Sequence, residues 1–156
     1  MYNLVSKGIY NLIVIGGDGS LTGAEYLRSE WSEHISDLVL EGSIPENAND
    51  LRFSIIGLVG SIDNDMCGTE ITIGSNTSLH RIVEALDNIT STAMSHSRAF
   101  VIEVMGRNCG WLALNASKAI GADYVFIPER PPPRNWAELM SDQISRVFIF
   151  IILEHK

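Results

Sequence analysis

The chain has 156 residues, the length of one domain or part of one, and 46% of them are hydrophobic, enough for a sizeable core. A formal net charge of −8 argues against a nucleic-acid-binding surface, although local arginines can still attract a phosphorylated ligand into a cleft. No apolar run approaches the roughly 18–20 residues of a membrane span, and no signal-peptide pattern opens the sequence. Cys67 and Cys109 lie far apart without metal-ligand spacing, so we interpret them as reduced thiols of an intracellular protein.

The most informative stretch is residues 12–23, where an apolar run leads into Gly-Gly-Asp-Gly-Ser at 16–20. The β-branched run predicts a buried parallel strand, and a helical pattern follows from about Thr22. Glycines let the backbone approach a ligand, and the N–H groups that open a helix favour phosphate. Asp18 would repel a bare phosphate but suits a Mg²⁺ ion held beside it. The turn predicts a nucleotide–Mg²⁺ site; from this motif alone, the alternative is a tight turn with an exposed aspartate.

The same unit of strand, polar cluster and helix recurs along the chain. The pattern predicts strands at residues 11–15, 53–59, 99–104, 124–127 and 147–153, and helices at about 22–31, 75–95 and 111–120. Gly121 is the expected C-cap of the last helix, residues 32–50 a helix with a surface loop, and the prolines at 131–133 an exposed stiff connector. Such alternation favours an α/β fold with a parallel sheet covered on both faces, in which ligands bind at the carboxyl ends of strands.

Two carboxylates, Asp63 and Asp65, follow the second predicted strand and flank Asn64. In an extended chain their side chains point to opposite sides, so that one can face a substrate hydroxyl and the other Mg²⁺. Two close carboxylates also push their pKa values apart, which suits one of them to act as a base. The alternative interpretation of this stretch is an Asx turn.

Arg107 follows the third predicted strand, directly after Gly106. The glycine permits close approach of the backbone, and arginine supplies a permanent positive fork for phosphoryl oxygens; the alternative is a solvated surface arginine. Arg98 precedes the same strand and therefore lies at the opposite edge of the sheet, from which it would not easily reach the same pocket within one subunit, whereas a neighbouring subunit could present it. His80 and His96 have no paired ligands or nucleophile, and we interpret them as a helix-face and a helix-end residue.

Taken together, three motifs resemble those of 6-phosphofructokinases. They are Gly-Gly-Asp-Gly-Ser at 16–20, Gly-Ser-Ile-Asp-Asn-Asp at 60–65 and Glu-Val-Met-Gly-Arg-Asn-Cys-Gly at 103–110, in this order and spacing. The similarity runs from Tyr2 to about Pro132, and residues 28–32 resemble the eukaryotic ATP-dependent type. The resemblance implies that residues 1–156 are a partial catalytic domain, from the N-terminal catalytic half, with an incomplete three-layer α/β parallel-sheet fold.

The resemblance also implies an activity. The family transfers the γ-phosphoryl group of Mg-ATP to the 1-hydroxyl of fructose 6-phosphate and so forms fructose 1,6-bisphosphate and ADP in glycolysis. The implied cofactor is Mg²⁺, with ATP as co-substrate. The implied protein is a cytoplasmic, allosteric homo-oligomer, a tetramer in the full-length parent, with no nucleic-acid or membrane partner.

By resemblance, the catalytic residues are Asp63, the base that takes the hydroxyl proton, and Arg107, while Asp18 binds Mg²⁺. The implied nucleotide-binding residues are Gly17, Asp18, Gly19 and Ser20. The implied sugar-binding residues are Ser61, Ile62, Asp63, Arg98, Met105, Gly106, Arg107 and Glu154, of which Arg98 reaches the sugar phosphate of the adjacent subunit. Gly19 fits the ATP-using branch, because pyrophosphate users commonly carry Asp at that position and Lys at the position of Gly60.

The chain also departs from the family pattern. Missing are an upstream Gly-rich nucleotide loop with an Arg-Cys pair, the downstream Arg and His-x-x-Arg phosphate ligands, and a second, regulatory half. We therefore expect the isolated chain to have little or no activity, and an inactive truncated product is one alternative. The other is a NAD or lipid kinase with the same Gly-Gly-Asp-Gly turn, which the motifs at 60–65 and 105–107 disfavour. The intact Asp18, Asp63 and Arg107 favour the catalytic half.

Overall fold

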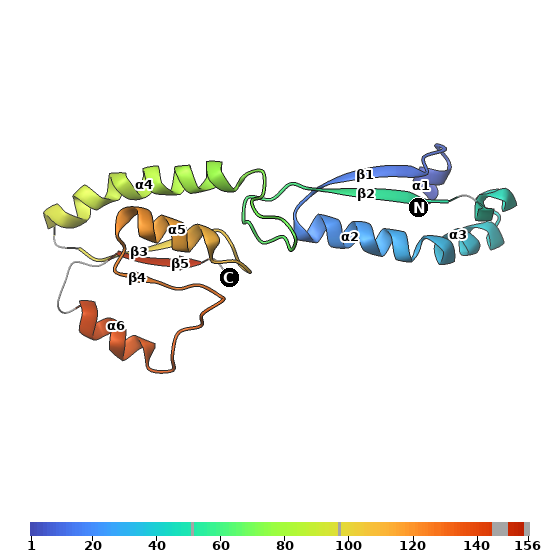
Figure 1. Cartoon of the computed structure of the whole chain (residues 1–156). Coiled ribbons are helices and arrows are strands. Elements are labelled where there is room, and N and C mark those ends of the chain that lie inside the picture. Colours follow the sequence, from blue (N-terminus) through green and yellow to red (C-terminus); the bar gives the residue numbers. More distant parts are fainter. Residues whose placement is uncertain (51, 97, 145–149, 155–156) are drawn as a thin grey trace. The chain divides into compact units, whose positions relative to one another are not determined.

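The computed structural model of the chain describes residues 1–50, 52–96, 98–144 and 150–154. The chain divides into two compact units, Met1–Gly60 and Ser61–Lys156, and each is described by itself (Figure 1). The strands pair as a two-stranded and a three-stranded parallel sheet, instead of the single sheet expected from the alternating pattern. No helix in the described ranges is long and apolar enough to cross a membrane.

The first unit holds one strand pair with its helices. Its elements are α1 (Tyr2–Val5), β1 (Asn11–Gly16), α2 (Asp18–Ser29), α3 (Trp31–Leu40), the 3₁₀ helix η1 (Glu46–Asp50) and β2 (Ser54–Val59). β1 and β2 run in parallel, with Asn11 opposite Ser54 and Gly16 opposite Val59. The register brings the carboxyl ends of both strands to the same edge, so the turn after β1 lies beside the start of the loop after β2.

The core of this unit lies away from the Gly-rich turn. Val5, Trp31, Ile35, Ile44 and Ala48 are buried together. The Trp31 ring stacks on that of Phe53, with centroids 3.8 Å apart and ring planes 7° from parallel. Such stacked aromatic pairs bury a large apolar area, so this contact fastens the start of α3 to the segment that leads into β2.

One face of the β1–β2 pair is covered and the other is not. α2 packs on both strands, while Ile13 and Ile15 of β1 remain 63% and 71% exposed. Ile56 and Leu58 of β2 are also exposed. The sequence pattern predicted strands buried on both faces. Because strand side chains alternate, a single helix can cover only half of them within this unit.

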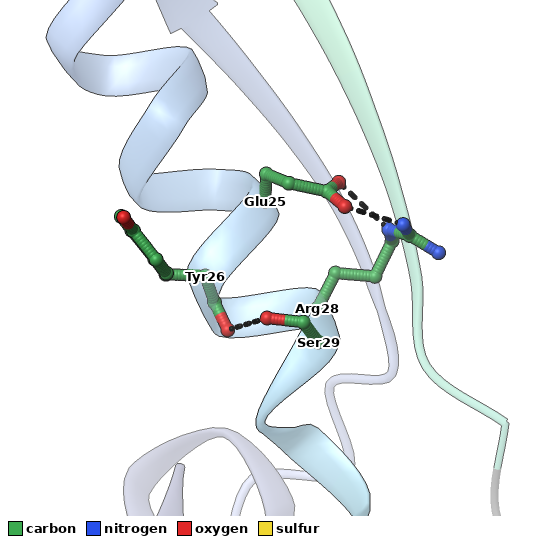
Figure 2. Close-up of polar contacts among 4 residues, drawn as sticks. All are labelled: Glu25, Tyr26, Arg28 and Ser29. Atoms are coloured by element: carbon green, nitrogen blue, oxygen red, sulfur yellow. Dashed lines mark hydrogen bonds and ion pairs between the residues drawn. The ribbon is translucent and has the colours of Figure 1, made fainter.

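The helix after β1 begins earlier than predicted, at Asp18 instead of about residue 22, and ends at Ser29. Gly17 is its extended N-cap, and Asp18 in the first turn is favourable beside the helix dipole. At the other end, Arg28 pairs with Glu25 (Nε to Oε2, 2.9 Å), and the Ser29 hydroxyl donates to the Tyr26 carbonyl oxygen at 3.0 Å (Figure 2). The ion pair is exposed and contributes little to stability. A new helix, α3, then starts at Trp31.

The second unit contains a three-stranded parallel sheet in the order β3-β5-β4. Its elements are α4 (Ser75–His96), β3 (Phe100–Val104), α5 (Trp111–Ile120), β4 (Tyr124–Val125), α6 (Trp136–Ile144) and β5 (Phe150–Glu154). The core is formed by Leu86, Val104, Ala113 and Ala116, against which Leu79 and Ile82 pack. Leu79, Ile82 and Leu86 lie at helical spacing, so this apolar face of α4 packs toward the core.

The predicted elements of this unit differ from the observed ones mainly where the chain leaves the sheet. α5 has the predicted bounds, and Gly121 caps it in the left-handed conformation with φ 69°. β4 is shorter than predicted, because Ile127 bridges Arg130 instead of extending the strand. Residues 147–149 of the predicted fifth strand lie outside the described residues. The helices α1 and α6 were not predicted, whereas the prolines at 131–133 are exposed and irregular as expected.

Candidate active site

The turn after β1 belongs largely to the helix that follows it. Gly17 is extended, and Asp18, Gly19 and Ser20 form the exposed first turn of α2. The first intrahelical bond runs from the Leu21 N–H to the Gly17 carbonyl oxygen at 3.1 Å, so the preceding N–H groups have no helical partner. Free N–H groups beside one exposed carboxylate fit a phosphate with a Mg²⁺ ion.

Gly16 and Gly19 differ in the space around them. A Cβ on Gly16 would lie 2.6 Å from both Cβ and Oγ of Ser20, whereas a Cβ on Gly19 would meet nothing within 4 Å. We expect Gly16→Ala to destabilise the chain by about 1–3 kcal/mol. The matched Gly19→Ala should be neutral or slightly stabilising, because alanine is the better helix former. Urea midpoints of the two variants check this; equal midpoints would contradict the packing argument.

The loop between β2 and α4 is closed on itself by hydrogen bonds. The Gly74 N–H donates to the Ser61 carbonyl oxygen at 3.2 Å. The Ser61 hydroxyl accepts the Asp63 N–H and donates to Asp65 Oδ1, both at 3.1 Å. Ser61 thus binds both the backbone of Asp63 and the side chain of Asp65. The alternative interpretation from the sequence was an Asx turn.

Asp63 keeps an oxygen available for another group. Its Oδ1 is buried and has no hydrogen-bond partner among the residues that the structure describes. Burial and, after it, the neighbouring Asp65 charge raise the pKa of the Asp63 carboxyl above its usual value. The direction agrees with the expectation that the pair pushes one pKa upward. A partly desolvated carboxylate with an unused acceptor atom suits a proton acceptor.

The raised pKa predicts how stability depends on pH. Between the unfolded-state and folded-state pKa values of Asp63, the folded chain binds more protons, so stability falls as pH rises through that window. Asp63→Asn removes this ionisation. We therefore expect the asparagine variant to be more stable than the unmodified chain at neutral pH, with a smaller difference at acid pH. Urea midpoints measured across pH check this; a variant that is less stable at neutral pH would contradict it.

The segment after β3 presents its arginine to solvent. Gly106 is buried with φ 125°, a conformation that favours glycine, and the Cys109 N–H closes the turn by donating to its carbonyl oxygen at 3.1 Å. Met105 and Arg107 are exposed, and Arg107 makes no salt bridge in the described part of the chain. An exposed guanidinium presents a planar fork of donors that suits phosphoryl oxygens.

The remaining predicted residues occupy the expected elements. Arg98 is exposed just before β3, at the opposite end of that strand from Arg107, as its position in the sequence predicted. His80 is exposed on α4, and His96 is the last residue of that helix. Glu154 ends β5 directly opposite Val104 of β3. The backbone of Glu154 thus lies at the sheet edge from which Met105–Arg107 emerge.

Gly60 adjoins the first turn closely. Its N–H donates to the Gly16 carbonyl oxygen at 2.8 Å, and a Cβ there would lie 3.3 Å from both the Gly16 nitrogen and Ile15 Cγ2. A lysine at this position would need a shift of the Gly16 backbone. The packing therefore agrees with a glycine at 60, the feature that the sequence associated with the ATP-using branch.

Three residues that sequence reasoning missed join the second unit's loops. The Asn64 side-chain oxygen accepts the Thr72 N–H from the end of its own loop at 2.9 Å. Cys109 donates its thiol to the Asn64 carbonyl oxygen at 3.2 Å, and Glu129 accepts the Gly110 N–H at 2.9 Å. Only Asn64 offered a local signal, because asparagine tolerates positive φ. No group of three acidic, histidine or cysteine side chains in the described ranges could hold a metal ion.

Comparisons with known proteins support the family resemblance of the three motifs. The sequence model of the phosphofructokinase family matches residues 1–153. The chain is 58% identical over 146 residues to the muscle-type ATP-dependent 6-phosphofructokinase of Homo sapiens, covering 92% of this chain and 19% of that protein. It is 54% identical over 162 residues to the liver type of Bos taurus, covering 98% and 21%. The chain therefore spans about a fifth of the length of these curated relatives.

Solved structures give the same result. The phosphofructokinase structure from Saccharomyces cerevisiae matches with a TM-score of 0.79 and 47% identity, over 98% of this chain and 21% of that one. A pyrophosphate-dependent phosphofructokinase from Marinobacter aquaeolei, at 21% identity and a TM-score of 0.61 over 97% of this chain and 38% of that one, shares the fold. The family assignment also decides against the NAD or lipid kinase alternative, because the match extends over nearly the whole chain and not only the Gly-rich turn. The chain belongs to the phosphofructokinase family.

Proposed function

We propose that this chain carries catalytic elements of an ATP-dependent 6-phosphofructokinase. The reaction moves the γ-phosphoryl group of Mg-ATP to the 1-hydroxyl of fructose 6-phosphate and yields fructose 1,6-bisphosphate and ADP. The names of the relatives support the substrates. The observation that carries the proposal is the Asp63 carboxylate, held after β2 with a buried oxygen that lacks a partner in the described chain and with its pKa raised.

In this proposal, Asp63 accepts the proton of the sugar 1-hydroxyl as that oxygen attacks the γ-phosphorus. The bond from phosphorus to the bridging oxygen of ATP breaks, and ADP leaves. The raised pKa brings the carboxylate nearer to the operating pH and so makes it a more effective base. The Ser61 hydroxyl, which holds the Asp63 backbone and the Asp65 carboxylate, keeps the base in place.

The phosphates are assigned to two other segments. Gly17, Asp18, Gly19 and Ser20 bind ATP through the free N–H groups that open α2, with Asp18 as the Mg²⁺ ligand. When bound, Mg²⁺ neutralises charge on the phosphate oxygens. Arg107, free of salt bridges in the described chain, stabilises the transferring phosphoryl group, while Met105, Gly106, Ile62 and Glu154 line the sugar site.

Two further parts of the proposal concern the assembly. Arg98 contacts the sugar phosphate of an adjacent subunit, which requires a homo-oligomer and is supported by its position at the end of β3 away from Arg107. We assign the protein to the cytoplasm, where glycolysis runs. Nucleic acid and membrane are not among the proposed partners.

A coupled assay tests the proposed function. The full-length gene product that contains these residues, supplied with Mg-ATP and fructose 6-phosphate, should release ADP at ordinary enzyme rates, about 1–10³ s⁻¹. Omission of the sugar should abolish the signal. The 156-residue chain by itself should show little turnover, because it spans 21% of the length of its liver-type relative. A full-length protein that is inactive with this pair of substrates would contradict the proposal.

Gly19 is expected to select ATP over pyrophosphate. A side chain at Gly19 meets no protein atom within 4 Å, so Gly19→Asp should leave the fold intact. Its carboxylate would instead crowd and repel the α-phosphate of ATP. We expect Gly19→Asp to lower kcat/KM for ATP strongly and to change the KM for fructose 6-phosphate much less. Gly19→Ala is the smaller, uncharged control. Steady-state kinetics with both substrates decide this; unchanged ATP kinetics would contradict the assignment.

A further inference from the structure

The network around Asn64 connects the two loops that carry the proposed base and the proposed phosphoryl-binding arginine. Asn64 has φ 58°, and it is the one residue other than glycine with positive φ in the described part of the chain. The left-handed conformation costs a side-chain-bearing residue free energy, and such strain persists only where the surroundings hold it. The chain turns sharply here, between Asp63 and Asp65.

The Asn64 amide makes the contacts that hold this conformation. Its Oδ1 accepts the Thr72 N–H at 2.9 Å and lies 3.4 Å from the Ser75 hydroxyl, and its Nδ2 donates to the Glu70 carbonyl oxygen at 3.3 Å. Thr72 and Ser75 are buried and hydrogen bonded to one another through their hydroxyls. The Asn64 side chain therefore links the turn between Asp63 and Asp65 to the buried Thr72 and Ser75 at the start of α4.

The Asn64 carbonyl oxygen faces the other loop. It accepts the thiol of Cys109 at 3.2 Å across 45 residues of sequence. Cys109 lies two residues after Arg107, and its N–H closes the turn at Gly106. The next residue, Gly110, caps α5 and donates its N–H to the Glu129 carboxylate at 2.9 and 3.1 Å. Both loops are thus tied to one residue.

From this geometry we propose that Asn64 is a positioning residue, which sets the orientation of Asp63 and, through the Cys109 thiol, the placement of the loop that carries Arg107. The inference rests on the proposed function for its catalytic consequence. It adds a residue that touches neither substrate and acts by holding two that do. Close control of this kind matters because a displacement of about 1 Å at a reacting group can cost 10²-fold in rate.

A titration that needs no catalysis tests the positioning. The ionisable residues around the network are Asp63, Asp65 and Glu70 on its own loop, Cys109 from the loop after β3 and Glu129 from the segment after β4. In the 156-residue chain, the carboxyl ¹³C resonance of Asp63 should titrate above the usual pH range for aspartate. Asn64→Gly keeps the backbone conformation but loses the amide contacts, so the carboxylate should become better hydrated and titrate at lower pH.

Matched variants separate this effect from a general loss of stability. Asn115 on α5 also donates its amide N–H to a backbone carbonyl oxygen, that of Trp111 at 2.8 Å, within its own helix. Asn115→Ala should leave the Asp63 titration where it is. Cys109→Ser keeps a donor for the Asn64 carbonyl oxygen, and Cys109→Ala does not, so the alanine variant should shift the titration more than the serine variant.

Kinetics of the full-length gene product then test the catalytic consequence. We expect Asn64→Gly to lower kcat by up to about 10²-fold with little change in KM for ATP, and to move the acid limb of the pH–rate profile to lower pH. An Asp63 titration that is the same in Asn64→Gly as in the unmodified chain would overturn the proposal. A shifted titration in a protein whose unmodified form has no sugar-dependent turnover would support the positioning and overturn the proposed function instead.

Discussion

Replacing Asp63 by serine in the full-length gene product should lower kcat by on the order of 10²–10⁴, the usual contribution of a positioned acid or base. The substitution removes the proton acceptor but leaves the Asp63 backbone N–H that bonds the Ser61 hydroxyl. KM for both substrates should change much less, because the interaction that is lost matters mainly in the transition state. Steady-state kinetics at saturating Mg²⁺ measure both quantities.

The pH dependence of the same variant gives a second readout. Because the pKa of Asp63 is raised, the carboxylate of the unmodified enzyme becomes protonated, and its rate falls, at a higher pH than for an ordinary aspartate. In Asp63→Ser that acid limb should disappear. Asp87→Ser, at an exposed carboxylate on α4, is the control and should retain both rate and profile. A near-normal kcat in Asp63→Ser would assign the base to another residue.

Excess Mg²⁺ should partly restore the rate of Asp18→Ala but not that of Asp63→Ser. Asp18→Ala removes an exposed carboxylate from the first turn of α2. We expect the Mg²⁺ concentration needed for half-maximal rate to rise by roughly 10–100-fold, the range in which weakened metal sites fall. Excess Mg²⁺ should restore part of the rate, since phosphate oxygens and water supply most ligands of this ion.

A Mg²⁺ titration of the two variants side by side decides between the roles. Excess Mg²⁺ should do nothing for Asp63→Ser, because a metal does not replace the proton acceptor. Equal rescue of both variants would mean that Asp63 also holds the metal, and no rescue of Asp18→Ala would remove Asp18 from the metal site.

Local patterns in the sequence were sufficient to locate most of the regular elements and to recognise the family. α5 has the predicted bounds because the left-handed Gly121 ends the helix by its own conformational preference. The helix α4 was predictable because its apolar residues recur at helical spacing, and residues at that spacing share a face whatever they pack against. The three motifs were recognisable because each stands at or directly after the end of a strand, where glycines, carboxylates and arginine interrupt the apolar pattern.

Contacts between distant residues decided the rest. Neither the bond between Cys109 and Asn64 nor the bond from the Gly110 N–H to Glu129 follows from sequence spacing, because each joins segments that are far apart along the chain. The start of α2 at Asp18 depends on where β1 ends against β2. The sequence by itself determined the approximate positions of the strands, of α2, α4 and α5 and of the family motifs, through periodicity and turn chemistry. Only the tertiary structure decided that Asn64 turns left-handed between two carboxylates, because the buried Thr72 and Ser75 that hold it there belong to the far limb of the loop.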